Sequence, residues 1–119
     1  MYRRGNYMKI AVPLTNGVLS AHFGHCEEFA LLEIDKDQKT ILGKTILKPP
    51  AHEPGVLPRW LGQLGVNVII AGGMGKRAIE IFAENDINVL VGAVQEEAEK
   101  LVKDFLAGSL TAGINLCDH

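Results

Sequence analysis

The feature that most constrains the fold is a near-continuous apolar run over residues 66–71. Most of its side chains are β-branched, and a run without polar alternation is typical of a parallel strand that is covered on both faces. A glycine-rich segment follows directly and breaks the strand. Helical spacing then predicts a helix over residues 76–85, with Ile79, Phe82 and Ala83 facing inward. A parallel strand flanked by helices indicates an α/β fold.

Four further strands are predicted along the chain. Apolar segments indicate strands over residues 9–14, 29–34, 40–47 and 87–91. The second and third of these are separated by a short polar turn, so they predict an antiparallel hairpin, and Gly43 is compatible with a β-bulge in it.

Two further helices complete the pattern. Helical spacing predicts helices over residues 56–64 and 95–107, and Gly108 is expected to end the second of them. The element order is therefore β-β-β-α-β-α-β-α, without an internal repeat. With right-handed crossovers we expect one mixed five-stranded sheet, in the strand order 3-2-1-4-5, flanked by helices.

This strand order has a consequence for function. The strands over residues 9–14 and 66–71 become parallel neighbours at the centre of the sheet, where their connections diverge. Open α/β sheets bind ligands at the carboxyl edge of such a point. We therefore expect the loop that carries His22, His25 and Cys26 to lie beside the glycine-rich turn.

Length and charge narrow the class of protein. The 119 residues fit one domain, and we expect a single domain over residues 8–119 after a disordered N-terminal extension of residues 1–7. The 12 basic and 14 acidic residues give a formal net charge of −2, so neither nucleic acid nor a membrane is expected as a partner. The two cysteines lie far apart in the sequence, which favours reduced thiols in the cytoplasm.

Three potential metal ligands gather after the first strand: His22, His25 and Cys26. Imidazole and thiolate groups suit zinc, copper and iron–sulfur clusters. Gly24 argues against a regular helix here, but a loop can bring the same atoms together. The spacing is not an established zinc signature, and a closed tetrahedral site needs a fourth ligand. The alternative interpretation is a loop histidine bonded to the backbone, with Cys26 packed as a small buried hydrophobe.

The glycine-rich turn is a second candidate site. It opens a helix, and the free N–H groups of a helix start favour an anion, to which two cations would add. The spacing matches neither a P-loop nor a dinucleotide-binding fingerprint. The alternative is a tight strand-to-helix turn, in which the methionine fills a gap. The candidate residues are Gly72, Gly73, Met74, Gly75, Lys76 and Arg77.

Two further candidate metal ligands, Cys117 and His119, lie in the tail of the sequence. A Cys-x-His pair on a tail could close over a site and supply missing ligands, whereas a disordered terminus is the alternative. Elsewhere no nucleophile–base pair stands out, and Asp35 and Asp37 occupy a turn, where aspartate bonds its own backbone. We therefore do not expect an enzyme.

Three sequence segments form a combined signature. The chain reads Met-Lys-Ile-Ala-Val-Pro over residues 8–13, His-Phe-Gly-His-Cys over 22–26 and Val-Ile-Ile-Ala-Gly-Gly-Met-Gly over 68–75. In combination they resemble the dinitrogenase iron-molybdenum cofactor biosynthesis family, over nearly the whole chain. The resemblance implies a ribonuclease H-like α/β fold and a small protein that binds and carries the iron–molybdenum cofactor or its iron–sulfur precursor. It points most directly to His22 of the His-Phe-Gly motif.

The resemblance and the residue pattern lead to the same prediction. The iron atoms of a large anionic metal–sulfur cluster can bind histidine and thiolate ligands. Amide N–H groups and cations stabilise its negative charge. We expect a non-catalytic cluster-binding or carrier protein, with a cluster-assembly protein or a metalloenzyme as its partner. Two alternatives stay open. One is a phosphate- or nucleotide-binding protein or enzyme that uses residues 72–77, and the other is a metal-independent interaction module.

Overall fold

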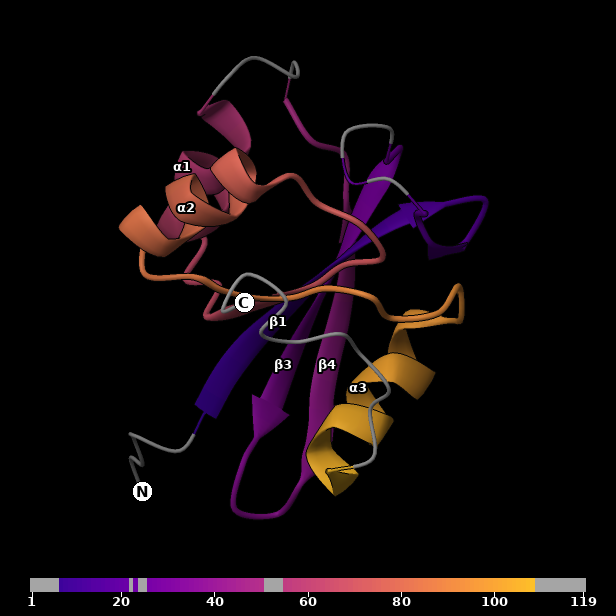
Figure 1. Cartoon of the computed structure of the whole chain (residues 1–119). Helices are drawn as coiled ribbons and strands as arrows, with labels where there is room; N and C mark the ends of the chain where they lie inside the picture. The colour runs from indigo at the N-terminus through magenta and orange to yellow at the C-terminus, as the bar shows by residue number, and fades with distance from the viewer. Residues whose placement is uncertain (1–6, 22, 24–25, 51–54, 109–119) are drawn as a thin grey trace.

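The computed structural model of the chain describes residues 7–21, 23, 26–50 and 55–108. Figure 1 shows the arrangement of the elements, and no helix among these residues is long and apolar enough to cross a membrane. The elements are β1 (Tyr7–Thr15), β2 (Val18–Leu19), β3 (Glu28–Asp35), β4 (Thr40–Leu47), α1 (Val56–Gln63), β5 (Val68–Ile70), α2 (Lys76–Glu84), β6 (Asn88–Leu90) and α3 (Ala98–Ala107).

One mixed sheet forms the centre of the molecule, in the order β4-β3-β1-β5-β6. β1 pairs antiparallel with β3 from Tyr7 to Leu14, and parallel with β5 at Ile10 and Ala11. β5 is in turn parallel to β6. The expected parallel neighbours at the centre of the sheet, β1 and β5, are therefore confirmed.

The prediction of five strands is wrong, because a sixth strand, β2, turns back on the end of β1 and pairs with it. The turn between them is Asn16-Gly17, with φ of 56° and 84°. Positive φ at both positions is typical of the two-residue turns whose twist matches a hairpin. The sequence indicates the turn, but two residues are too few to show a strand pattern. With β2 counted, the order β4-β3-β1-β5-β6 replaces the expected 3-2-1-4-5, while the same long segments remain neighbours. The ribonuclease H-like classification stays a prediction.

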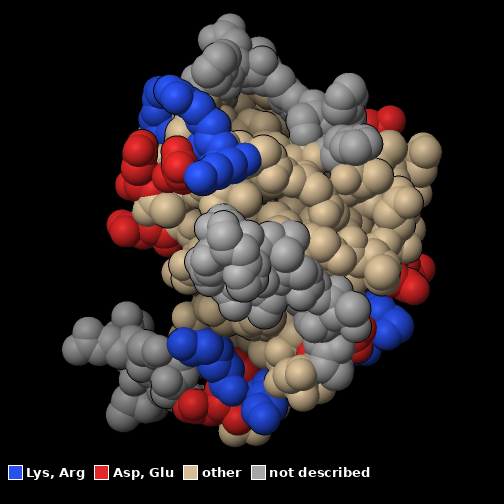
Figure 2. Space-filling view, viewed as in Figure 1, with Lys and Arg blue, Asp and Glu red and all other residues tan. Residues whose placement is uncertain are grey.

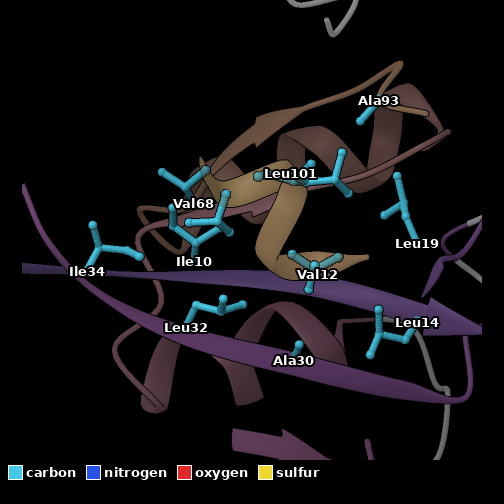
Figure 3. Packing of buried hydrophobic residues seen from close by; sticks show 13 residues of the cluster. Ile10, Val12, Leu14, Leu19, Ala30, Leu32, Ile34, Val68, Ala93 and Leu101 are labelled. Carbon is cyan, nitrogen blue, oxygen red and sulfur yellow. The ribbon is translucent and has the colours of Figure 1, made fainter. Parts of the chain in front are cut away.

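Helices cover both faces of the sheet, so the fold has three layers (Figure 1). α3 covers one face, where Leu101 packs with Val12 and its neighbours, as Figure 3 shows. α1 and α2 cover the other face, where Leu61 and Phe82 pack in one cluster with Ala11. Successive residues of a strand point to opposite faces, which is why Ala11 and Val12 belong to different cores.

Three details of the helices and the first strand differ from expectation. Ala83 was expected to face inward and is exposed, because α2 lies at the margin of the sheet and fully buries only Phe82. α3 begins at Ala98 rather than at residue 95, since Glu97 has an extended backbone and forms the N-cap. Tyr7 belongs to β1 rather than to an N-terminal extension, and residues 1–6 lie outside the described part of the chain.

At the end of the sheet where β1 begins, side chains close the turns. The backbone N–H of Lys9 donates to Asn67 Oδ1 at 2.8 Å. In the turn between β3 and β4, Asp35 Oδ1 accepts the N–H of Asp37 at 3.0 Å and of Gln38 at 3.2 Å. The expectation that the aspartate of this turn bonds its own backbone is confirmed. We call this end the amino edge, and the end where β1, β5 and β6 finish the carboxyl edge.

Candidate functional site

The loop that follows β2 lies directly against the turn that follows β5, at the carboxyl edge. The N–H of Phe23 donates to the carbonyl oxygen of Gly73 at 3.1 Å. A Cβ atom on Gly72 would lie 3.0 Å from the carbonyl oxygen of Ser20 and 3.1 Å from that of Ala21. The predicted neighbourhood of these two segments, which are far apart in the sequence, is therefore confirmed.

The glycines of the turn have different structural tasks. Gly72 has no room for a side chain, because the atoms around it are backbone atoms that cannot move aside cheaply. Gly73 is less restricted, since its Cβ would lie 3.3 Å from the Ala21 carbonyl oxygen. Gly75 faces open space and forms the N-cap of α2 with an extended backbone. The close approach of the loop therefore depends mainly on the absence of a side chain at Gly72.

An aromatic side chain holds the loop to the molecule. The half-buried Phe23 ring lies edge-on to Phe29, with 6.0 Å between ring centroids, and to Phe82, with 5.4 Å. Phe29 in turn meets Trp60 of α1 at 5.7 Å. Such edge-to-face pairs add roughly 0.5–1.5 kcal/mol each beyond the area that they bury. Phe23 thus connects the loop to the core under α1 and α2.

Cys26 is a core residue. Its side chain is 5% exposed and packs in the cluster that contains Phe29 and Leu57. Its backbone N–H donates to the carbonyl oxygen of Phe23 at 3.3 Å. Burial raises the pKa of the Cys26 thiol to about 11, against the smaller opposing effect of a backbone hydrogen bond. Its burial in this cluster agrees with the alternative interpretation of Cys26 as a small buried hydrophobe.

Two cations open α2 beside the glycine turn. Lys76 and Arg77 are both exposed, and the first turn of α2 contains no acidic residue. Met74 is half-buried and packs against the core under α1 and α2, as the gap-filling interpretation expects. Figure 2 shows basic and acidic side chains together at the upper left, over the α1 and α2 layer, and a broad uncharged area to the right.

Four of the predicted ligands, His22, His25, Cys117 and His119, lie outside the described residues. Within the described part, no three histidine, cysteine, aspartate or glutamate residues come together in a way that could hold a metal ion. The structure therefore brings together the backbone of the two predicted segments and the cations that follow the glycine turn.

Sequence reasoning missed two residues that shape this edge. Ser20 is buried, and its Oγ accepts a hydrogen bond from Thr15 Oγ1 at 2.9 Å while its carbonyl oxygen faces Gly72. Nothing in the sequence marks Ser20. Phe23 could have been found, because a large apolar side chain between two histidines in a polar loop predicts an anchor to the core.

A sequence model of the family described as dinitrogenase iron-molybdenum cofactor matches residues 7–108. The chain belongs to the dinitrogenase iron-molybdenum cofactor family. This confirms the resemblance that the three sequence segments suggest. The matched residues include both segments of the carboxyl edge and all six strands and three helices of the described structure.

Similar proteins agree with this family and this fold. An uncharacterised protein of Methanocaldococcus jannaschii is 36% identical over 108 residues, which are 87% of this chain and 89% of the relative. The crystal structure of a protein named PH0822 superposes with a TM-score of 0.80 at 25% identity, covering 94% of this chain and all of the other. The apo form of the orange protein of Desulfovibrio gigas has a TM-score of 0.68 at 20% identity, covering 90% and 93%, and so shows the fold alone.

Proposed function

We propose that this member of the dinitrogenase iron-molybdenum cofactor family is a non-catalytic protein that binds and carries an iron–sulfur-type metal cluster. The cargo would be the iron–molybdenum cofactor or a precursor of it. Membership of the family supports the class of cargo. One observation supports the site: the residues on both sides of His22 are held against the glycine turn, Ala21 by close packing and Phe23 by a hydrogen bond to Gly73.

The chemistry of the carboxyl edge suits such a cargo. Metal–sulfur clusters of this kind are large anions, and cations and the N-terminal end of a helix stabilise negative charge. Lys76 and Arg77 are exposed at the start of α2, with no acidic residue in that turn to neutralise them. His22, the residue of the His-Phe-Gly motif, would supply the ligand to iron. Cys26 would support the loop from the core instead of binding metal.

The proposal includes the cellular setting. We place the carrier in the cytoplasm, where the reduced state of both cysteines would be maintained, and Cys26 forms no disulfide among the described residues. Its partner would be a cluster-assembly protein or a metalloenzyme that gives or receives the cluster. The domain would consist of residues 8–119, with Met8 already inside the first strand.

Anaerobic reconstitution with iron and sulfide tests the proposal. The chain is expected to take up iron and sulfide in a fixed ratio and to gain visible absorbance. His22→Ala is expected to weaken cluster binding at least about tenfold, which corresponds to roughly 1.4 kcal/mol. Cys26→Ala is expected to leave binding unchanged. Gln38→Ala, in the exposed turn at the amino edge, is the control for an unrelated polar substitution. Equal binding by all variants would reject the assignment of His22.

The two cations can be tested separately. Lys76→Ala with Arg77→Ala is expected to weaken cluster binding several-fold at low salt and less at high salt, because salt screens exposed charges. The matched control is Lys36→Ala with Lys103→Ala, which removes two exposed cations away from the glycine turn. If both double variants lose the same affinity, the effect is one of net charge and not of this site.

A second candidate function uses the same turn without a metal cluster. The N-terminal end of α2 has no side-chain cap, so its N–H groups could bind phosphate or a nucleotide. Thermal unfolding with millimolar inorganic phosphate, mononucleotides and dinucleotides checks this alternative. A rise in Tm that Lys76→Ala removes would support it, and no rise would exclude it.

A further inference from the structure

A third segment reaches the carboxyl edge, beside the two that form the proposed cluster site. It consists of residues 91–97, which connect β6 to α3. Figure 1 shows this segment running from β6 beside the turn that follows β5, and then into α3. Neither of the two candidate segments in the sequence includes these residues. We call residues 91–97 the third loop.

The start of the third loop is bonded to the glycine turn. The N–H of Gly92 donates to the carbonyl oxygen of Gly72 at 2.9 Å. The N–H of the next residue, Ala93, donates to the carbonyl oxygen of Ala71 at 3.2 Å. Gly72 also approaches the loop around His22, because a Cβ atom on it would lie 3.1 Å from the Ala21 carbonyl oxygen. Three segments that are far apart in the sequence therefore meet at Gly72.

The end of the third loop is bonded to the segment that precedes His22. The carbonyl oxygen of Glu96 accepts the N–H of Leu19, in β2, at 2.9 Å. Ala93 is buried in the same core cluster as Leu19, and Figure 3 shows both residues at one end of that cluster. The third loop is thus held near both of its ends by main-chain hydrogen bonds, and the main chain on both sides of His22 is likewise held against the glycine turn.

Between these contacts the third loop exposes an apolar side chain. Val94 is 54% exposed, whereas the three residues that follow it are polar or charged. A single exposed apolar side chain is common on a protein surface, so exposure alone gives Val94 no role. Its position does, because ligand sites are lined mainly by apolar side chains with a few polar groups among them.

We propose that the third loop forms a further wall of the cluster site and that Val94 contacts the bound cluster. This contact rests on the proposed function, since the ligand is the same metal–sulfur cluster. The loop around His22 and the cations at the start of α2 bind the iron and the negative charge. Val94 covers the cluster from water.

An apolar contact adds what the other groups of the site do not supply. In the proposed function His22 provides a ligand to iron, and Lys76 and Arg77 provide positive charge. The hydrophobic surroundings of a metal site control how much water reaches it. Charges also act more strongly where water is excluded. Val94 therefore slows the attack of competing ligands on the cluster and strengthens its attraction to the two cations.

The charges of the third loop indicate which of its residues faces the cargo. Glu96 and Glu97 are exposed, and their carboxylates repel an anionic cluster. Glu97 is the N-cap of α3, so both glutamates belong to the end of the loop next to that helix. Gly92 and Val94, nearer to the glycine turn, carry no charge. The contact is therefore assigned to Val94 and not to the glutamates.

Cluster binding by Val94→Asp tests this contact in the full chain, reconstituted anaerobically with iron and sulfide. The new charge faces an anionic cluster, so affinity is expected to fall at least about tenfold at low salt and less at high salt. Leu42→Asp is the matched control. Leu42 is 55% exposed, nearly the same as Val94, but it lies in β4 and lines a hollow at the amino edge. It adds the same net charge and is expected to leave the affinity unchanged.

Two milder substitutions separate shielding from charge. An iron chelator removes the cluster, and the loss of visible absorbance gives the rate. Val94→Ala is expected to lose the cluster several-fold faster, because a smaller side chain admits water and chelator. Val94→Ile keeps a branched apolar side chain and is expected to restore the original rate, and Leu42→Ala is the control. The Tm of each cluster-free variant is expected to be unchanged, since both positions are exposed. If Val94→Asp lowers the Tm, the chelation rates of the Ala and Ile variants decide.

The outcomes distinguish this contact from the proposed function. Equal affinities and equal chelation rates in the Val94 and Leu42 variants, with binding that still depends on His22, would overturn the contact of the third loop alone. If the unchanged chain takes up no iron and sulfide, or if His22→Ala binds as well as it does, the proposed function itself is overturned, and the contact with it.

Discussion

The two ends of the sheet are built in different ways. At the amino edge, side chains close several contacts, as when Asp35 accepts the N–H groups of Asp37 and Gln38 and Asn67 accepts that of Lys9. At the carboxyl edge, backbone meets backbone between distant segments, as when the Phe23 N–H donates to the Gly73 carbonyl oxygen. The amino edge also has main-chain bonds, since the Asn67 N–H donates to the Lys9 carbonyl oxygen at 2.9 Å, but there they extend the pairing of neighbouring strands, whereas Phe23 and Gly73 join two loops.

The difference bears on the proposed cluster site. Where backbone contacts fix a loop, the side chains of that loop are not needed to hold it in place. Gly72 allows the close approach because it has no Cβ, and the Phe23 ring fixes the loop from below. The loop around His22 is thus supported at its flanks, which is the arrangement that preorganised ligand-binding loops require.

Among the variants that test this comparison, Phe82→Ala is expected to change stability most. Phe82 is fully buried and contacts the Phe23 ring, so its removal leaves a cavity under the loop. The free energy of unfolding should fall by about 3–5 kcal/mol. Leu42→Ala, which shortens an exposed side chain of β4, is the control and should change it by less than about 0.5 kcal/mol. Urea unfolding measures both, and similar losses would contradict the packing described for the loop.

The close approach of the two loops predicts that Gly72→Ala is destabilising. The new Cβ would lie 3.0 Å from the Ser20 carbonyl oxygen, so the loop must move and stability should fall by about 1–3 kcal/mol. Gly43→Ala in β4 is the matched control, since its Cβ would meet nothing within 4 Å. Urea unfolding compares the two variants. A neutral Gly72→Ala would show that the carboxyl edge does not depend on contact between backbones.

Cys26, in the core beneath the loop, makes the free energy of unfolding depend on pH. Its pKa is raised from 9.0 to about 11 in the folded chain, so the folded state retains the proton that the unfolded state loses. The contribution to stability is complete below pH 9 and is lost as the pH rises through 11, by about 2–3 kcal/mol, since one pKa unit corresponds to about 1.4 kcal/mol. The Cys117→Ser chain, with and without Cys26→Ala, is unfolded by urea from pH 8 to 11. Parallel curves would show that Cys26 is not protected by burial.

The smallest effect on stability is expected from removing an ion pair on the surface between the two edges. Lys44 Nζ lies 2.6 Å from Glu99 Oε2, and this hydrogen bond is the main cause of the lowered pKa of Glu99. Lys44→Ala should return the Glu99 pKa toward its ordinary value, which NMR titration measures, and should reduce stability by less than about 1 kcal/mol. Because the folded pKa is lowered, this contribution exists above the unfolded pKa and disappears as the pH falls. A loss comparable to that of Gly72→Ala would mean that surface pairs matter as much as the carboxyl edge.

The sequence by itself determined the α/β class, the long neighbouring strands and the helices, because their apolar periods are strong and local. It also placed the glycine turn at the carboxyl edge, since the order of elements and the right-handed crossover leave few topologies. It missed β2, which is too short for a period, and placed Ala83 inward, since periodicity does not reveal where a sheet ends.

Tertiary structure alone decided the roles of individual residues at the site. Cys26 and Met74 are potential ligands by residue type, and only the tertiary structure shows that both pack with the core under α1 and α2. Gly72 and Gly75 look equivalent in the sequence, yet only Gly72 faces the backbone of another loop. Burial and close approach depend on segments that are distant along the chain, and for that reason no local pattern in this sequence records them.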